Sequence, residues 1–262
     1  MGHVPRKRFG QHFLHEHGII EKIVAAVDPR PGDLVVEIGP GLGALTRPLL
    51  DRLERLHVVE LDRDLAQRLE AEFGPDRLAV HRADALEFDF GALGAGLRVV
   101  GNLPYNVSTP LLFHIARSAG RLRDLHFMLQ REVVERMVAA PSTPEYGRLS
   151  VMLQYRFAME KLFLVSPGCF RPPPKVESAM VRLVPLARPD PLALDEEMLA
   201  AAVTRAFTRR RKTLRNALAG VATEADLASV GINAGLRPEN LSVADYVRIA
   251  NLASQRAAAS AR

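Results

Sequence analysis

Short apolar runs alternate with segments of helical periodicity along the first half of the chain. The apolar runs predict buried strands at residues 34–38, 57–62, 78–81, 97–101 and 125–129. Helical periodicity is found at residues 18–27, from about residue 44, at 65–73 and at 110–119. Strands that alternate with helices predict an α/β fold with a mostly parallel, doubly wound sheet.

The pattern changes at residues 187–191, where Ala-Arg-Pro-Asp-Pro interrupts it. Beyond this point the spacing is helical through residue 250, with helix starts expected near Asp195, Thr223 and Ser242. We therefore predict an α/β domain at 1–187 and a smaller all-helical domain at 188–262. We expect residues 1–17 to form a basic leader outside the core and residues 254–262 to form a disordered tail.

The composition narrows the class of protein. The chain has 262 residues, 35 Lys and Arg against 30 Asp and Glu, and a net charge of +5, which favours an anionic partner without establishing one. The single cysteine, Cys169, excludes an intrachain disulfide and is interpreted as structural. Because no signal-like or membrane-length apolar segment is present, we expect a cytoplasmic protein with no membrane partner, and no metal site.

A glycine-rich turn, Glu37 to Gly43, directly follows the first predicted strand. Glycines allow a sharp backbone turn and let a ligand lie against it. The spacing of Gly39, Gly41 and Ala44 also satisfies the dinucleotide fingerprint, so NAD and a ligand-free turn both remain alternatives. Glu37 has an alternative role, in which its carboxylate orders the turn by accepting backbone N–H groups.

Two acids follow the next two predicted strands. Glu60 can accept hydrogen bonds from both ribose hydroxyls of a nucleoside. Asp84 can accept one from an adenine amine, although it can equally cap a helix. Since the carboxyl ends of parallel strands meet at one edge of a sheet, the turn and the acids together favour S-adenosylmethionine over NAD.

The tetrapeptide Asn102-Leu103-Pro104-Tyr105, after the fourth predicted strand, is the most specific motif in the chain. Adenine N6 is a poor nucleophile because its lone pair is delocalised into the ring. The Asn102 side-chain carbonyl and the Leu103 backbone carbonyl can accept from its two N–H bonds, while Tyr105 stacks on an extruded base. Catalysis is then mainly positioning, without a strong general base. The alternative is an ordinary loop.

With these motifs in place, the chain resembles the small-subunit ribosomal RNA adenine dimethyltransferases of the KsgA type. The resemblance covers nearly the whole chain and is carried by residues 7–14, 37–43, 59–62, 84–85, 101–105, 126–130, 146–150, 170–176 and 210–216. It implies a Rossmann-like class I methyltransferase sheet. It further implies dimethylation of N6 on two adjacent adenosines in a hairpin near the 3′ end of 16S rRNA, within an assembling small subunit. We expect a monomer.

The resemblance also assigns roles to individual residues. The cofactor-binding set is His12, Leu14, Gly39, Gly41, Glu60, Leu61, Asp84, Ala85 and Asn102. Asn102, Leu103 and Tyr105 form the acceptor site, and Phe170 is its second aromatic wall. This chain departs from many members, which have Asn at position 12. Unlike Asn, His12 can become cationic near neutral pH.

The segment Thr204 to Asn216 is strongly basic. If it is helical, its basic residues cover one side and an apolar stripe faces inward: Leu199, Val203, Phe207, Leu214 and Leu218. Together with the basic N-terminus, it predicts contacts that position RNA without reading its sequence. The predicted RNA-binding residues are Arg6, Lys7, Arg8, Arg209, Arg210, Arg211, Lys212 and Arg215. A merely solvated charged face is the alternative.

Three competing functions remain. A resistance-type dimethylase of large-subunit ribosomal RNA shares these motifs, although residues 170–175 and the basic C-terminal segment favour the small subunit. A non-catalytic assembly or transcription factor would not need intact Asn102 and Tyr105. An NAD dehydrogenase would need a hydride-transfer constellation near the strand ends, which the sequence does not suggest.

Overall fold

The computed structural model describes residues 11–105 and 107–260, and its residues separate into two compact units. The sheet unit comprises Met1–Val134 and Ala158–Pro185, and the helical unit comprises Glu135–Phe157 and Leu186–Arg262. The domains expected at 1–187 and 188–262 remain a prediction. The two units are defined by contacts between residues, and such contacts do not show whether either part folds alone. Within the described residues, no helix is long and apolar enough to cross a membrane.

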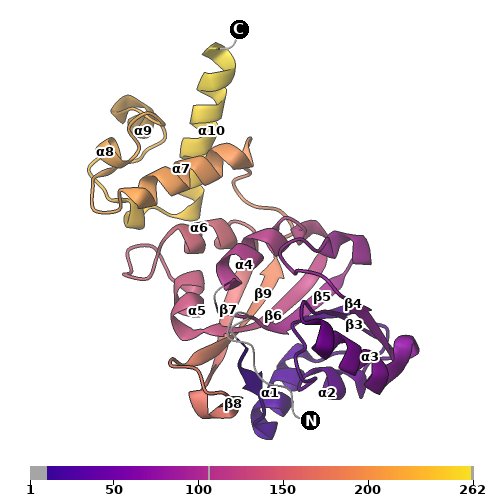
Figure 1. Cartoon of the computed structure of the whole chain (residues 1–262). Helices are drawn as coiled ribbons and strands as arrows, with labels where there is room; N and C mark the ends of the chain where they lie inside the picture. The colour runs from indigo at the N-terminus through magenta and orange to yellow at the C-terminus, as the bar shows by residue number, and fades with distance from the viewer. Residues whose placement is uncertain (1–10, 106, 261–262) are drawn as a thin grey trace. The chain divides into compact units, whose positions relative to one another are not determined.

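A sheet forms the centre of the sheet unit (Figure 1). It has seven strands in the order β4-β3-β2-β5-β6-β9-β7. The strands are β2 (Val35–Ile38), β3 (Leu56–Val59), β4 (Leu78–His81), β5 (Leu97–Asn102), β6 (Leu122–Gln130), β7 (Phe157–Val165) and β9 (Ser178–Pro185). Strands β2 to β6 pair with one another in parallel, and β9 pairs antiparallel with β6. The predicted doubly wound sheet is therefore confirmed.

Helices pack against this sheet as the amphipathic pattern requires. They are α1 (His17–Val27), α2 (Thr46–Leu50), α3 (Arg63–Arg77) and α4 (Ser108–Ala116), while α5 (Arg131–Val138) crosses from the sheet unit into the helical unit. Three 3-10 turns accompany them: η2 (Phe90–Leu93), η3 (Ala119–Arg121) and η4 (Pro167–Cys169). The apolar face of α1 buries Ile20, Ile23, Val24 and Val27, as its spacing predicted.

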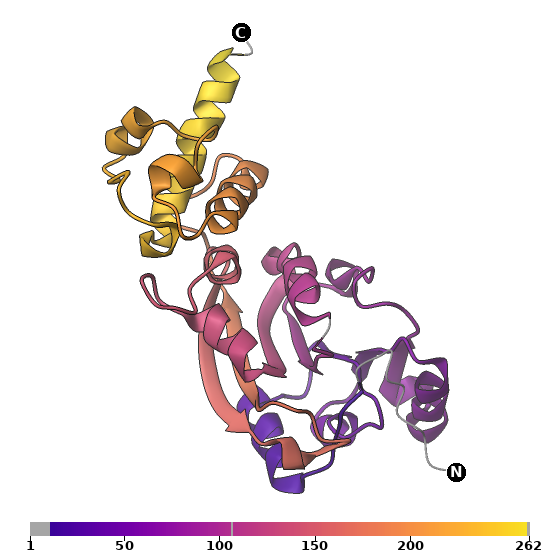
Figure 2. The ribbon, with the colours of Figure 1, turned by 60° about the vertical axis from the view of Figure 1, so that its left-hand side comes forward.

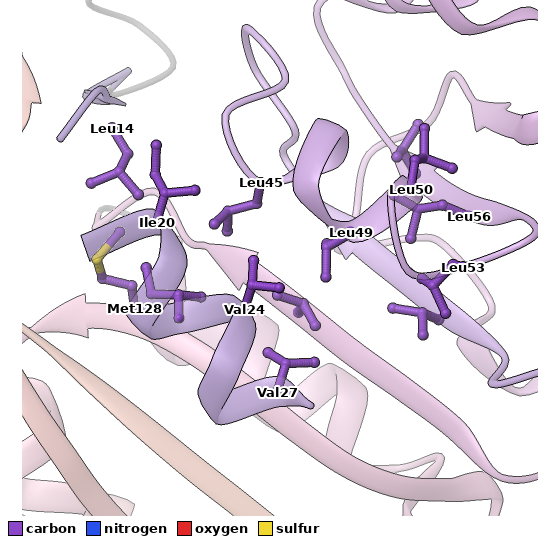
Figure 3. Close-up of a cluster of buried hydrophobic side chains, with 14 of the residues drawn as sticks. Leu14, Ile20, Val24, Val27, Leu45, Leu49, Leu50, Leu53, Leu56 and Met128 are labelled. Carbon is purple, nitrogen blue, oxygen red and sulfur yellow. The ribbon is translucent and has the colours of Figure 1, made fainter. Parts of the chain in front are cut away.

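The core beside the glycine turn joins α1, α2 and the sheet, as Figure 3 shows around Val24, Leu49 and Met128. Leu14 belongs to this core and is only 6% exposed. It lies in β1 (Phe13–Leu14), which pairs antiparallel with β8 (Phe170–Arg171). The expectation that residues 1–17 lie outside the core is therefore wrong for Leu14, because strand pairing brings its side chain inward.

The helical unit contains α6 (Arg148–Gln154), α7 (Glu196–Thr208), α8 (Leu214–Ala217), α9 (Glu224–Ser229), η5 (Pro238–Asn240) and α10 (Val243–Ser260) (Figure 2). The predicted helix starts are confirmed. Asp195 caps α7 through the N–H groups of Glu197 and Met198, and Thr223 caps α9 through that of Asp226. Ser242 immediately precedes α10 and accepts from the N–H of Asp245.

One condition set for this unit is not met, and one expectation is wrong. Residues 204–216 do not form one helix, because α7 ends at Thr208 and the N–H groups of Leu214 and Arg215 bond to Leu236 and Ala234 instead. The tail is helical to Ser260 rather than disordered. Its alanines favour helix, and Arg256 forms an ion pair with Asp226 at the start of α9.

Candidate active site

A pocket of about 360 Å³ opens at the carboxyl ends of the parallel strands in the sheet unit. This volume suits a small-molecule ligand. The pocket brings together every residue predicted for the cofactor, and two of the other acceptor residues: His12, Leu14, Gly39, Gly41, Glu60, Leu61, Asp84, Ala85, Asn102, Leu103 and Tyr105. Residues distant in sequence meet here because parallel strands end at the same sheet edge.

The glycine turn presents bare backbone to the pocket. Gly39 and Gly41 have φ angles of 64° and 58°, in the left-handed region where glycine carries no steric penalty. A Cβ on Gly39 would meet no atom within 4 Å, so the space above it is open. A Cβ on Gly41 would lie 3.1 Å from the Phe13 ring, so a side chain here would require that ring to shift.

Glu60 connects the glycine turn to the end of β3. One carboxylate oxygen accepts from the N–H of Gly41 at 3.2 Å, and the other accepts from the N–H of Asp62 at 2.8 Å. Burial raises the pKa of Glu60, and these two backbone hydrogen bonds oppose the shift. Its carboxylate therefore orients the turn in addition to lining the pocket.

Glu37 is buried beneath the same turn, with 2% of its surface exposed. Burial raises its pKa to about 8, although a 2.7 Å hydrogen bond from the Thr46 hydroxyl acts in the opposite direction. Thr46 is the first residue of α2. Glu37 thus accepts from a side chain that anchors α2, not from the turn's backbone N–H groups as the alternative interpretation held.

Asp84 caps a turn and also lines the pocket, while its contact with an adenine amine remains a prediction. One carboxylate oxygen accepts from the N–H of Leu86 at 2.9 Å, which is the geometry of a turn cap. The residue also lines the pocket together with its neighbours Ala83 and Ala85. The cap therefore holds the acid at the pocket wall.

The orientation of the Asn102 amide follows from its hydrogen bond. Its Nδ2 donates to the backbone carbonyl of His12 at 3.0 Å. Since a carbonyl oxygen can only accept, the amide nitrogen must face His12, and Oδ1 is directed the other way. The next residue, Leu103, donates its N–H to the carbonyl of Met128 at 3.1 Å. Both predicted acceptor groups thus lie on backbone that the sheet fixes.

Tyr105 is held at both its ring and its hydroxyl. The ring stacks with that of His12, with centroids 5.7 Å apart and planes at 27°. The hydroxyl lies 2.6 Å from Oγ of Ser178. Burial raises the pKa of Tyr105, which keeps the phenol protonated. His12 in turn donates from Nδ1 to the carbonyl of Pro172 at 2.7 Å, which places its proton on that nitrogen.

The structure does not bring Phe170 to the pocket. Its side chain is 1% exposed and packs in the core beside α1, while its backbone pairs with Leu14. The pocket lining excludes it. The proposed wall role of Phe170 remains a prediction, and in this structure the ring makes core contacts instead.

The predicted RNA-binding residues differ in their surroundings. Arg6, Lys7 and Arg8 lie outside the described residues. Arg209, Arg210 and Arg215 donate to Asn216, Pro144 and Glu224 within the helical unit. Arg211 and Lys212 are exposed, and neither side chain forms a hydrogen bond or ion pair with any described residue, although the backbone N–H of Lys212 donates to Arg209. Three of the predicted RNA-binding arginines therefore also form contacts within the helical unit.

Sequence reasoning missed some members of the site. Phe13, Ile38, Leu42, Val107 and Leu111 form apolar pocket walls. The first three lie within the motifs at 7–14 and 37–43 but received no role, and no local motif distinguishes Val107 and Leu111 from core residues. Ser178 was also missed, because its position against Tyr105 depends on the antiparallel pairing of β9. Among the described residues, no group of three His, Cys, Asp or Glu side chains is placed to hold a metal ion.

Comparison with known proteins adds a family and a fold. The family model described as "Ribosomal RNA adenine dimethylase" matches residues 2–255. Two curated relatives are both named "Ribosomal RNA small subunit methyltransferase A". The one from Chromobacterium violaceum is 60% identical over 250 residues, covering 95% of each chain. The one from Aromatoleum aromaticum is 61% identical over 249 residues, covering 95% of this chain and 94% of the relative.

Two solved structures share the fold over most of the chain. A dimethyladenosine transferase from Plasmodium falciparum has a TM-score of 0.79 at 24% identity, covering 91% of this chain and 96% of that one. The 23S rRNA methyltransferase ErmE has a TM-score of 0.71 at 26% identity, covering 93% and 100%. These likenesses confirm the predicted class I methyltransferase fold.

Proposed function

The chain belongs to the ribosomal RNA adenine dimethylase family, and we propose that it dimethylates N6 of two adjacent adenosines near the 3′ end of 16S rRNA. The family resemblance predicted from the sequence is thereby confirmed, and the chain is a methyltransferase. The proposed methyl donor is S-adenosylmethionine, and the proposed partner is the small ribosomal subunit during its biogenesis.

The small subunit is favoured over the large one by the degree of similarity. Relatives named for the small subunit are about 60% identical to this chain over 95% of its length. The likeness to ErmE, a 23S rRNA methyltransferase, is 26%. The large-subunit alternative therefore has weaker support, and the acceptor motif argues against a purely non-catalytic factor.

The pocket offers S-adenosylmethionine a suitable volume and suitable hydrogen-bond acceptors. The open space above Gly39 would admit the methionine end against bare backbone. Glu60 would accept from the ribose hydroxyls and Asp84 from the adenine amine. When bound, the cofactor supplies an electrophilic methyl group on a cationic sulfur.

The acceptor groups would hold the target adenine amine for attack. Oδ1 of Asn102 accepts from one N6–H bond, and the Leu103 carbonyl accepts from the other. Tyr105 stacks on the extruded base. These contacts favour the tetrahedral form of N6, whose lone pair would bond to the methyl carbon as the bond from that carbon to sulfur breaks. The product S-adenosylhomocysteine would keep the electron pair on sulfur, and the N6 proton would then pass to solvent. Catalysis is then largely positioning, which can lower a barrier by several kcal/mol.

The observation that carries this proposal is the fixed Asn102 amide. Its Nδ2 is bound to the His12 carbonyl, so Oδ1 is the end available in the pocket that also contains Gly39, Glu60 and Asp84. Rotating the amide would lose that bond and would set a donor against the donor groups of adenine.

The substrate is tested by methyl transfer from labelled S-adenosylmethionine to small and large subunits that lack the modification. We expect incorporation into the small subunit alone, with mapping that shows two adjacent dimethylated adenosines near the 3′ end of 16S rRNA. Incorporation only into the large subunit, or into neither, would overturn the proposal.

Replacing Asn102 tests the acceptor site. We expect Asn102→Ala to reduce methyl transfer by on the order of a hundredfold or more, because N6 loses one of two positioning acceptors. Calorimetry should still detect S-adenosylmethionine binding, and filter binding should still detect RNA. A variant with near-normal turnover would contradict the assigned role of the amide oxygen.

A further inference from the structure

Ser178 lies where the sheet topology brings a distant segment to the acceptor site. It is the first residue of β9, and it pairs with Gln130, the last residue of β6. Because β9 is antiparallel to β6, its beginning lies at the edge where the parallel strands end. Asn102 ends β5 at that same edge, paired with Met128 of β6.

The two hydroxyl groups are close and shielded. Oγ of Ser178 lies 2.6 Å from the Tyr105 hydroxyl, although the residues are 73 positions apart. Ser178 is 0% exposed, so water does not compete at its side chain. The phenol is the more acidic of the two hydroxyls and therefore the better donor, with Ser178 as acceptor. The bond is at the short end of the usual range for O–H···O contacts.

This bond restrains a ring that otherwise has freedom to turn. Tyr105 follows the β5 end by three residues and lies in a turn, outside any helix or strand. Its ring contact is the stacked imidazole of His12, which limits tilt but leaves the ring free to slide in its own plane. A hydrogen bond at the far end of the phenol fixes the direction of the ring axis.

We infer that Ser178 is a positioning residue for methyl transfer, acting through Tyr105. By holding the phenol, it fixes the stacking surface relative to the Asn102 amide, so that a bound adenine presents N6 to both acceptors. The inference rests on the proposed function. It adds a residue of β9 to a site otherwise built from the pocket lining, since Ser178 is not part of that lining.

The test measures kcat, the KM for subunits and the cofactor Kd for three variants. Ser178→Ala should lower kcat by on the order of tenfold, because a small misplacement of a positioned group is costly. Its cofactor Kd should equal that of the wild type. Ser178→Thr keeps the hydroxyl and should recover most of the lost kcat. Tyr105→Phe keeps the ring but loses the same bond, so it should show a comparable loss.

The double variant separates positioning from general damage. In the Tyr105→Phe background, Ser178→Ala should cause no further loss of kcat, because the bond is already absent. Additive losses in the double variant would overturn the inference. So would an undiminished kcat in Ser178→Ala or in Tyr105→Phe. If Ser178→Ala does not fold, Tyr105→Phe alone decides: normal kcat in that variant refutes the role of the bond.

A matched control is Ser150→Ala in the helical unit. Ser150 is also a fully buried serine, and its hydroxyl donates to the carbonyl of Arg136. We expect this variant to lower the melting temperature without changing kcat. Failure of the wild-type protein to methylate any subunit would instead refute the proposed function, so the two failures are distinguishable.

Discussion

Glu37 is a carboxyl group whose protonation is coupled to folding. Burial raises its pKa from 4.5 to about 8, so the folded protein binds a proton here that the unfolded chain releases above pH 4.5. The stabilisation is fully present below pH 4.5 and is lost as the pH rises through about 8. We predict that Glu37→Gln flattens the decline of melting temperature between pH 5 and 8, as measured by calorimetry.

Glutamine is the appropriate replacement because it keeps the size of the side chain and an oxygen for the Thr46 hydroxyl. Relative to the wild type, the variant should gain stability as the pH increases from 5 to 8. If both proteins show the same pH profile, Glu37 does not hold the proton assigned to it.

Residues of the site could be predicted from the sequence where a polar side chain comes at or shortly after the end of a strand. Asn102, Glu60 and Asp84 each come at a strand end, and strand order alone places them at one edge. Hydrogen-bond partners that lie far away in the sequence could not be predicted. The His12 carbonyl that orients Asn102 is 90 positions away, and neither sequence pattern nor spacing encodes that contact.

At the scale of elements, Gly101 controls how closely β5 approaches β2. A Cβ at this position would lie 2.8 Å from the carbonyl oxygen of Ile38 and 3.0 Å from the side chain of Leu103. We predict that Gly101→Ala destabilises the protein by about 1–3 kcal/mol, since overpacking forces backbone to move. Chemical denaturation measures the loss.

Gly120→Ala is the matched control for this substitution. A Cβ on Gly120 would meet nothing within 4 Å, so we expect a change within about 0.5 kcal/mol. Equal stability of the two variants would show that β5 and β2 can separate without cost. A loss of stability confined to Gly101→Ala would support a close contact between β5 and β2 at the residue before Asn102.

Elements with a clear period were predicted, and elements defined by their partners were not. The strand at Leu78–His81 and the helix ending at Val27 agree closely with the apolar pattern. The two-residue strands β1 and β8 have no pattern of their own and exist through mutual pairing. Likewise, the break between α7 and α8 arises because residues 214–215 bond to residues 234–236, a contact that helical propensity cannot foresee.

At the scale of the whole molecule, the predicted affinity for RNA depends on charges that the fold leaves free. We predict that the double variant Arg211→Ala/Lys212→Ala weakens RNA binding and lowers the magnitude of the slope of log K against log salt by about 1.4 to 1.8. The reason is that both side chains are exposed and have no partner among the described residues. Cofactor affinity should be unchanged.

Arg210 provides the contrast for this experiment. Its guanidinium donates to the carbonyl of Pro144 at 2.7 Å and lies 3.7 Å from a carboxylate oxygen of Glu239. Arg210→Ala should therefore lower the melting temperature more than it changes the salt slope. An unchanged slope in the double variant would show that these two charges do not meet phosphate groups.

The late position of β9 in the sequence has a consequence for the growing polypeptide. Strands β2 to β6 are translated by residue 130, whereas Ser178 emerges 48 residues later, after β7 and β8. Until then, β6 lacks the antiparallel neighbour that covers it in the finished sheet, and Tyr105 lacks its hydroxyl partner. Strand β1, which contributes Phe13 and Leu14 to the pocket, likewise lacks its partner β8 until residue 171 is made, so the pocket of a nascent chain is completed only when the last strands of the sheet unit have emerged.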